Sequence, residues 1–246
     1  MKLGLSNTVK SQVSGEEWTP DDLSSLLHWY KYDTGISTYF VAGAGNNIVT
    51  EWQDQKGSNH LIDTSTPANT SGYNTSQPKY DSTTKEVVFD HGGDQLDFTS
   101  HLSLGTFSIY VLLKFEDTNY GDFFMEDEAG NNFLKIQTST ELRVKMSGNR
   151  HDFTSSTELS EETPYVIGYE RADTPATTDD RIAVYIDGDA LTQSGTGDGT
   201  QAITDTLDLE KIGDPANILR IKEIVICNDA LSSQDRTSLT NYLRGL

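Results

Sequence analysis

The sequence predicts an all-β fold: a two-sheet antiparallel β-sandwich with short helices near the N-terminus and at the C-terminus. Residues 106–115 are the clearest observation, because every second residue from Phe107 is apolar and one side of the strand therefore faces a core. Turn-forming residues are frequent, with 20 glycines in 246 residues. No helical period of useful length occurs between residues 86 and 228, which excludes a parallel α/β fold.

The N-terminal part of the chain is predicted to be a polar arm followed by a helix. Residues 1–17 are polar and lack periodicity. Thr19 and Pro20 are a typical N-cap and first helical residue, and two acids follow them. The apolar face of this helix is formed by Leu23, Leu26 and Leu27. From Trp29 onward, strands and turns replace the helical pattern.

The later strands are short apolar or alternating runs between Gly- and Asp-rich turns. They are expected at residues 87–89, 96–98, 106–115, 133–136, 142–146, 165–169, 182–186 and 207–212. A last apolar strand over residues 221–226 leads through a short turn into a C-terminal helix. Ser232 is its predicted N-cap, and its apolar face carries Leu239, Tyr242 and Leu243.

The composition excludes several classes of protein. The 38 acidic and 18 basic residues give a formal net charge of −20, whereas binding to DNA or to an anionic membrane needs a basic surface. No apolar run approaches the ~18 residues of a membrane span, and the N-terminus lacks a signal-peptide pattern. Cys227 is the only cysteine, and its place at the end of an apolar strand favours a small buried hydrophobe. We therefore expect a protein made in a cytoplasm, with no nucleic-acid or membrane partner.

Four segments, taken in order, carry a family resemblance. Residues 26–60 contain L-L-H-W-Y and E-W-Q-D-Q-K-G-S-N-H, and residues 88–96 are V-F-D-H-G-G-D-Q-L. Residues 184–188 are V-Y-I-D-G, and residues 212–232 contain I-G, I-K-E-I-V-I and L-S. Together they resemble the concanavalin A-like lectin/glucanase superfamily, and within it the laminin-G-like domains. The residues that depart from the usual pattern are Lys56, Ser58 and Lys222.

The resemblance implies a jelly-roll sandwich of the concanavalin A-like kind over residues 18–246, preceded by the arm of residues 1–17. The opening M-K-L-G-L-S-N and the motif spacing are similar to virion proteins of marine bacteriophages, especially those that infect cyanobacteria. This implies a non-enzymatic structural protein located in the virion, such as a capsid-exterior decoration protein. The arm would anchor it to other virion proteins, including the major capsid protein. The alternative is a host-recognition adhesin, a tail-fibre or tip component that binds cell-surface polysaccharide. A homo-oligomer fits either role.

Glycoside hydrolysis is the remote alternative. Glucanases of this fold carry Glu-x-Asp-x-x-Glu on one strand, where the acids act as nucleophile and general acid. The nearest match here is Glu126, Asp127 and Glu128. Asn131 stands where the last Glu would be, and Gly130 beside it indicates a hairpin turn. We therefore expect a solvated acidic turn and assign no catalytic residue.

Calcium is the one ion that the resemblance implies, since laminin-G-like domains often bind it at a rim through carboxylates and carbonyls. The acids that lie near predicted turns are Asp94, Asp187, Asp189 and Asp214. No run has the density of an EF-hand loop, so the metal ligands stay unassigned and no other cofactor is expected. The histidines, which show no metal-ligand spacing, are His28, His60, His91, His101 and His151.

Glycan binding is the partner interaction that a lectin-like fold suggests, although a fold alone does not establish a function. Aromatic side chains near loops can stack on a sugar ring. The candidates in this sequence are Tyr73, Tyr80 and Tyr120.

Overall fold

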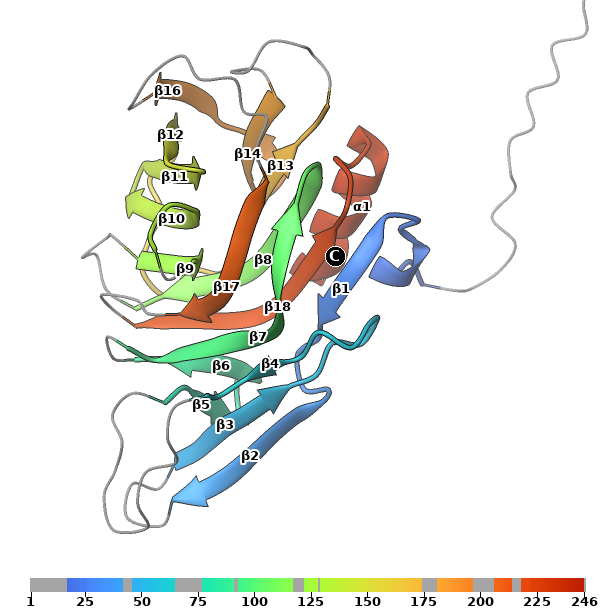
Figure 1. The fold of residues 1–246 in the computed structure, drawn as a ribbon, viewed down its shortest axis with the longest axis vertical. Helices are drawn as coiled ribbons and strands as arrows, with labels where there is room; N and C mark the ends of the chain where they lie inside the picture. The colour runs from blue at the N-terminus through green and yellow to red at the C-terminus, as the bar shows by residue number, and fades with distance from the viewer. Residues whose placement is uncertain are drawn as a thin grey trace, which may run out of the picture.

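The computed structural model describes residues 17–41, 46–64, 77–90, 93–116, 122–127, 129–173, 181–196, 206–213 and 218–245. These residues form two antiparallel β-layers that pack against each other, with helix α1 (Ser233–Arg244) on the outer face of the first layer (Figure 1). The predicted all-β sandwich is therefore confirmed. No helix in the described part of the chain is long and apolar enough to cross a membrane.

The first layer is built around β18 (Leu219–Cys227), which runs antiparallel to β8 (Phe107–Phe115) along one edge. Along its other edge β18 pairs first with β6 (Glu86–Phe89) and then with β1 (Leu26–Tyr30). From β8 the layer continues through β13 (Tyr165–Arg171), β14 (Ile182–Ile186) and β15 (Asp189–Ala190). From β6 it continues through β5 (Lys79–Asp81), β3 (Asn46–Trp52) and β2 (Ile36–Val41).

The second layer is also antiparallel. In spatial order it contains β4 (Leu61–Ile62), β7 (Gln95–Leu104), β17 (Leu207–Gly213), β9 (Asp122–Glu126), β10 (Phe133–Thr138), β11 (Glu141–Met146), β12 (Asn149–Thr154) and β16 (Thr192–Thr196). The short strand β4 also pairs with β3, so the two layers are joined at this edge.

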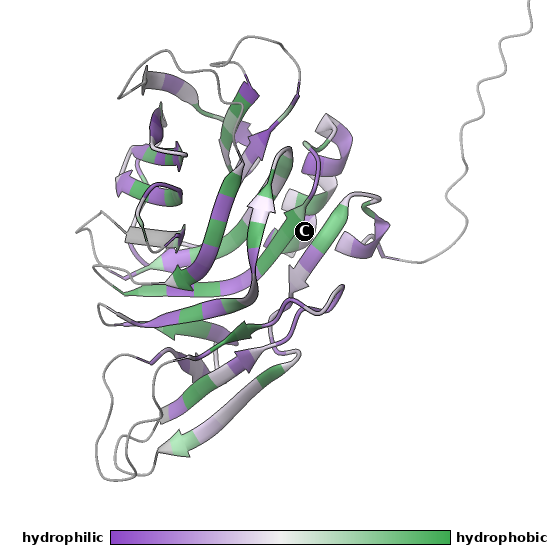
Figure 2. Ribbon diagram, viewed as in Figure 1, coloured by the Kyte–Doolittle hydropathy of each residue, from purple (hydrophilic) through white to green (hydrophobic). Residues whose placement is uncertain are grey.

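The main core lies between the layers. The alternating residues predicted to face it on β8 are all buried there, from Phe107 to Phe115. Leu209 and Ile212 of β17 meet them from the second layer, while Asp208 and Glu210, on either side of Leu209, are only half-buried. Figure 2 shows this alternation of hydrophobic and hydrophilic residues along β17. Such a pattern is expected for a strand that buries one face.

A second core lies between the first layer and α1. Tyr110 and Leu112 of β8, which the alternation assigned to solvent, are buried here against Leu239 and Leu243 of the helix. The helix begins as predicted, because the Ser232 hydroxyl accepts a hydrogen bond from the backbone N–H of Asp235. Helix, first layer and second layer therefore form three stacked layers, and α1 covers apolar residues that solvent would otherwise reach.

An ion pair near the N-terminal end of α1 holds the helix on the first layer. Arg236 donates two hydrogen bonds to the Glu170 carboxylate, at 2.8 and 3.1 Å, and the Tyr110 hydroxyl donates a third at 2.6 Å. Gly168 makes room for this arrangement, since a Cβ there would lie 2.4 Å from the Tyr110 ring. The contact between α1 and β13 is thus specific as well as apolar.

One detail of the N-terminal prediction is wrong. The predicted helix is only the 3₁₀ turn η1 (Pro20–Asp22), and Leu26 and Leu27 belong to β1 instead. Pairing with β18, which places Leu26 opposite Cys227 with a bulge before His28, outweighs the local helical pattern. Cys227 is buried as expected, and burial raises the pKa of its thiol to about 12.

Candidate functional site

The site begins at an irregularity in β18. Ile221 lies opposite Leu113 of β8, but Glu223 lies opposite Leu112, so Lys222 is the extra residue of a β-bulge. At the same point β18 exchanges β6 for β1 as its other neighbour. The bulge therefore places two consecutive side chains, Lys222 and Glu223, at a gap in the first layer beside the C-terminal end of α1.

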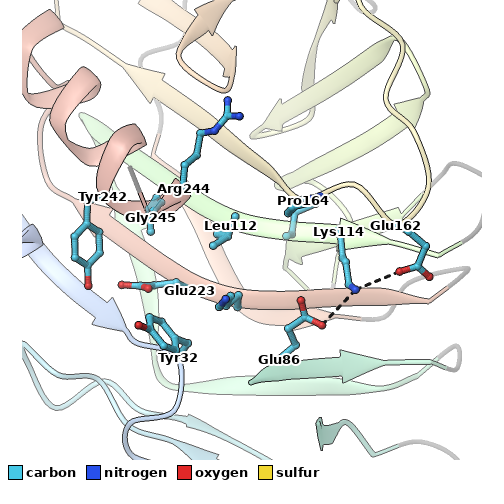
Figure 3. A pocket seen from close by; sticks show the side chains of 13 residues that line it. Tyr32, Glu86, Leu112, Lys114, Glu162, Pro164, Glu223, Tyr242, Arg244 and Gly245 are labelled. Carbon is cyan, nitrogen blue, oxygen red and sulfur yellow. Dashed lines mark hydrogen bonds and ion pairs between the residues drawn. The ribbon is translucent and has the colours of Figure 1, made fainter. Parts of the chain in front are cut away.

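Two adjoining clefts open at this gap. The first has a volume of about 380 Å³ and lies between the end of α1 and strands β8 and β18 (Figure 3). The second, of about 510 Å³, is lined by Trp18, Lys31 and Asn241 among others. Both clefts include Tyr32, Tyr242 and Gly245 in their walls. We call the two clefts together the Tyr32–Tyr242 groove.

Glu223 is the buried acid of this groove, with 1% of its surface exposed. Its carboxylate accepts a 2.6 Å hydrogen bond from Trp29 Nε1 and another from the Tyr242 hydroxyl. Burial raises its pKa to about 7, although these two donors and the nearby Lys31 and Lys222 lower it in part. In Figure 3 the Tyr242 hydroxyl and the Glu223 carboxylate point toward each other, with Tyr32 beside them.

Aromatic rings form the apolar part of the groove. The Tyr242 ring lies edge-to-face with Trp29, at 6.2 Å between centroids, and with Trp18, at 6.1 Å. Lys31 Nζ lies 5.0 Å from the centroid of Trp29, and Lys222 Nζ lies 5.2 Å from the centroid of Tyr32. Rings, ammonium groups and a carboxyl therefore line one surface. This combination suits a ligand with an apolar face and several hydroxyl groups.

The loop after β3 fixes the position of Trp29 through a hydrogen bond to its backbone. Asp54 Oδ1 accepts hydrogen bonds from the backbone N–H groups of Trp29 and Lys56, both at 3.0 Å, and Oδ2 accepts one from His28 Nδ1 at 2.7 Å. Burial works to raise the pKa of Asp54, but these donors and the N–H of Gly57 hold it at about 2. A Cβ at Gly57 would lie 2.7 Å from the carboxylate, so glycine allows the loop to close over it. In the first motif of the family resemblance, Asp54 and Gly57 therefore have a structural role, which is to hold β1 in place.

The acidic segment considered for catalysis forms a hairpin turn between β9 and β10, as predicted. Asp127 accepts hydrogen bonds from the Asn131 N–H and Asn132 Nδ2, both at 2.8 Å, and Glu126 pairs with Lys211 at 3.0 Å. The expectation of a solvated turn is wrong for these two acids, because each is only 8% exposed. Their hydrogen bonds explain why they tolerate burial. Glu128 lies outside the described residues.

The acids considered for calcium are not brought together. Asp94 is fully buried and accepts a hydrogen bond from the N–H of Asp90. Asp187 accepts one from the N–H of Val166 and pairs with Arg244, while Asp189 is exposed in β15. Among the described residues no group of three or more His, Cys, Asp or Glu side chains could hold a metal ion. Asp214 lies outside the described residues.

The tyrosines and histidines singled out in the sequence lie away from the groove or serve the fold. Tyr80 is half-buried against the main core, and its hydroxyl donates to Asp33. His28 and His60 both belong to the Asp54 loop, where His60 Nδ1 accepts from the Asp54 N–H. His101 lies beside Glu210, and His151 is buried in β12. Tyr73, Tyr120 and His91 lie outside the described residues.

The sequence contains a signal for one part of the groove, the bulge in β18. In I-K-E-I-V-I two consecutive polar residues interrupt an apolar strand, which is how a bulge on a buried strand appears in a sequence. The sequence predicts Tyr242 on the apolar face of the helix, and its ring is partly buried there. Tyr32 has no such signal, because it follows β1 in a turn and becomes part of a site only through its neighbours.

No family model matches this chain, and no curated protein sequence matches it. Its fold is similar to several solved structures. A structure of botulinum neurotoxin type C gives a TM-score of 0.55 at 12% identity, covering 89% of this chain and 51% of that one. The receptor-binding domain of botulinum neurotoxin type G gives 0.54 at 12% identity, with the same two coverages of 89% and 51%. A Trypanosoma rangeli sialidase in complex with 2,3-difluoro-KDN gives a TM-score of 0.50 at 12% identity, covering 91% of this chain and 33% of that one.

The chain therefore spans about half the length of the neurotoxin chains and a third of the sialidase chain. The shared part is a β-sandwich, in agreement with the fold class that the sequence predicted. At this low identity the similarity shows the fold alone.

Proposed function

We propose that this protein is a non-enzymatic, glycan-binding structural protein of a phage particle, with the Tyr32–Tyr242 groove as its glycan-binding site. The observation that carries the proposal is the groove itself. It presents the rings of Tyr32, Tyr242 and Trp18 beside Lys222 and Asn241, whose polar groups can form hydrogen bonds with hydroxyl groups. Ligand sites usually combine apolar walls with a few oriented polar groups in this way.

Binding is favoured over hydrolysis because the carboxyl groups that line the first cleft are already engaged by other side chains of the protein. Cleavage of a glycosidic bond by two carboxyls needs one on each side of that bond. Glu223 is engaged by Trp29 and Tyr242, and Glu86 and Glu162 both pair with Lys114, at 3.7 and 3.2 Å. Cell entry of the structurally similar type C neurotoxin depends on two ganglioside molecules, which supports glycan recognition by analogy of fold only.

Glycan binding can be tested on the full chain with a glycan array and titration calorimetry. We expect at least one saccharide to bind, and Tyr32→Ala to lower its affinity about tenfold, because a central aromatic contact is lost. Tyr39→Ala is the matched control, since Tyr39 is 36% exposed on β2 and does not line the groove. An array without any binding, with and without calcium, would remove the glycan-binding proposal.

The virion role rests on the resemblance of the sequence to phage structural proteins and is tested separately. We expect particles assembled with a chain that lacks residues 1–17 to carry much less of this protein, because the arm is proposed to bind other virion proteins. Quantitative mass spectrometry of purified particles measures the incorporation, and the melting temperature of the shortened chain checks that it still folds. Unchanged incorporation of a folded, shortened chain would rule out the arm as the anchor.

A further inference from the structure

We propose that the Tyr32–Tyr242 groove selects acidic saccharides, whose carboxylate group binds the ammonium groups of Lys31 and Lys222. This inference rests on the proposed glycan binding, because it names the class of glycan that the same groove takes.

Lys31 and Lys222 differ from the other basic residues of the groove. Among the described residues, neither ammonium group has a carboxylate oxygen within 4.0 Å. Lys114 pairs with two glutamates at the far end of the first cleft, and Arg244 pairs with Asp187 at 3.2 Å. In a chain of net charge −20, two cations without a close ion pair at one groove leave room for an anionic ligand.

The aromatic rings hold these ammonium groups without neutralising them. Lys31 lies over Trp29 and Lys222 lies over Tyr32, and a cation over a ring keeps its full charge. The bulge brings Lys222 to the groove beside Glu223. In a regular strand, these two consecutive side chains would point to opposite faces of the sheet. The two cations are therefore positioned before any ligand arrives, which lowers the entropic cost of binding.

The carboxyl of Glu223 is the alternative partner for both lysines, and it is a poor one. Burial raises its pKa to about 7, so it is only partly ionised at neutral pH. The titratable and charged groups that act on it, or on the Tyr242 hydroxyl that binds it, are Lys31, Tyr32, Lys222, Tyr242 and Glu17. If the two lysines only neutralised the charge of Glu223, a carboxylate on the ligand would not increase its affinity for the groove. Comparing charged and uncharged ligands tests this alternative.

Matched ligand pairs separate charge from shape. The probes are short oligomers of galacturonic, glucuronic and mannuronic acid, each compared with its methyl ester, which keeps the sugar ring and removes the charge. Binding to the full chain is measured by titration calorimetry in about 0.15 M salt, where charges farther than about 8 Å are screened. The overall negative charge of the chain then contributes little, and an acid preference reports on the groove.

We expect at least one uronate to bind about tenfold more tightly than its ester. Lys31→Gln and Lys222→Gln should each remove most of that difference, because each lowers the affinity for the acid far more than the affinity for the ester. Lys145→Gln on β11 makes the same charge change in the second layer and should leave both affinities unchanged.

Equal affinity for acid and ester, or an acid preference that survives both lysine substitutions, would overturn the inference and leave glycan binding standing. Absence of binding by every neutral and acidic glycan would instead overturn the proposed function. The two failures are therefore distinguishable.

Discussion

Replacing Glu223 with glutamine should stabilise the protein at pH 8 and leave its stability nearly unchanged at pH 4.5 or below. The folded-state pKa of Glu223 is raised from its ordinary 4.5 to about 7 by burial. Its contribution to stability is therefore fully present below pH 4.5 and is lost as the pH rises through about 7, because the unfolded chain releases the proton first. A shift of this size corresponds to about 3 kcal/mol in the free energy of unfolding.

Glutamine can replace the carboxyl without this penalty, since its side-chain oxygen still accepts the hydrogen bond from Trp29 Nε1. Urea unfolding of both proteins at pH 4.5, 6 and 8 measures the difference, which we expect to grow with pH. Glu162→Gln is the control: the Glu162 side chain is 58% exposed at the other end of the cleft, so the effect should stay below about 1 kcal/mol at every pH. A Glu223→Gln effect that does not depend on pH would show that the carboxyl is ionised throughout.

Features that depend on local chemistry could be predicted from the sequence. The alternation in residues 106–115 gives β8 and its inward face, and Ser232 with Asp235 three residues later gives the start of α1. Asp54, for example, organises the loop behind β1 through donors that are close to it in sequence or fixed by the strand.

Features that depend on contacts between distant segments could not be predicted. Leu26 and Leu27 have a helical pattern, and only pairing with β18 makes them a strand. Tyr110 is buried because a helix more than a hundred residues later covers it. The groove is the clearest case, since Tyr32, Glu223 and Tyr242 come from a turn, a bulge and a helix, and their side chains meet only where β18 exchanges β6 for β1.

Replacing Asp54 with alanine should destabilise the protein at pH 7 by about 3 kcal/mol, because the N–H groups of Trp29 and Lys56 and the His28 ring lose their acceptor together. The folded-state pKa of Asp54 is lowered to about 2 from 3.8, so its contribution is present above pH 3.8 and is lost as the pH falls through about 2. The difference between the two proteins should therefore shrink in acid, which is the opposite of the trend expected at Glu223.

Denaturant unfolding at pH 7 and pH 3 tests this prediction, with Asp21→Ala as the control. Asp21 also pairs with Lys56, at 3.0 Å, but its side chain is 59% exposed, so its loss should cost less than about 1 kcal/mol. Because Asp54 holds the backbone of Trp29, and Trp29 holds Glu223, the Asp54 variant should also bind the glycan proposed for the groove more weakly while it is still folded. If the Asp54 variant loses stability but keeps full affinity, the groove is positioned by α1 and β18 alone and the Asp54 loop serves only the fold.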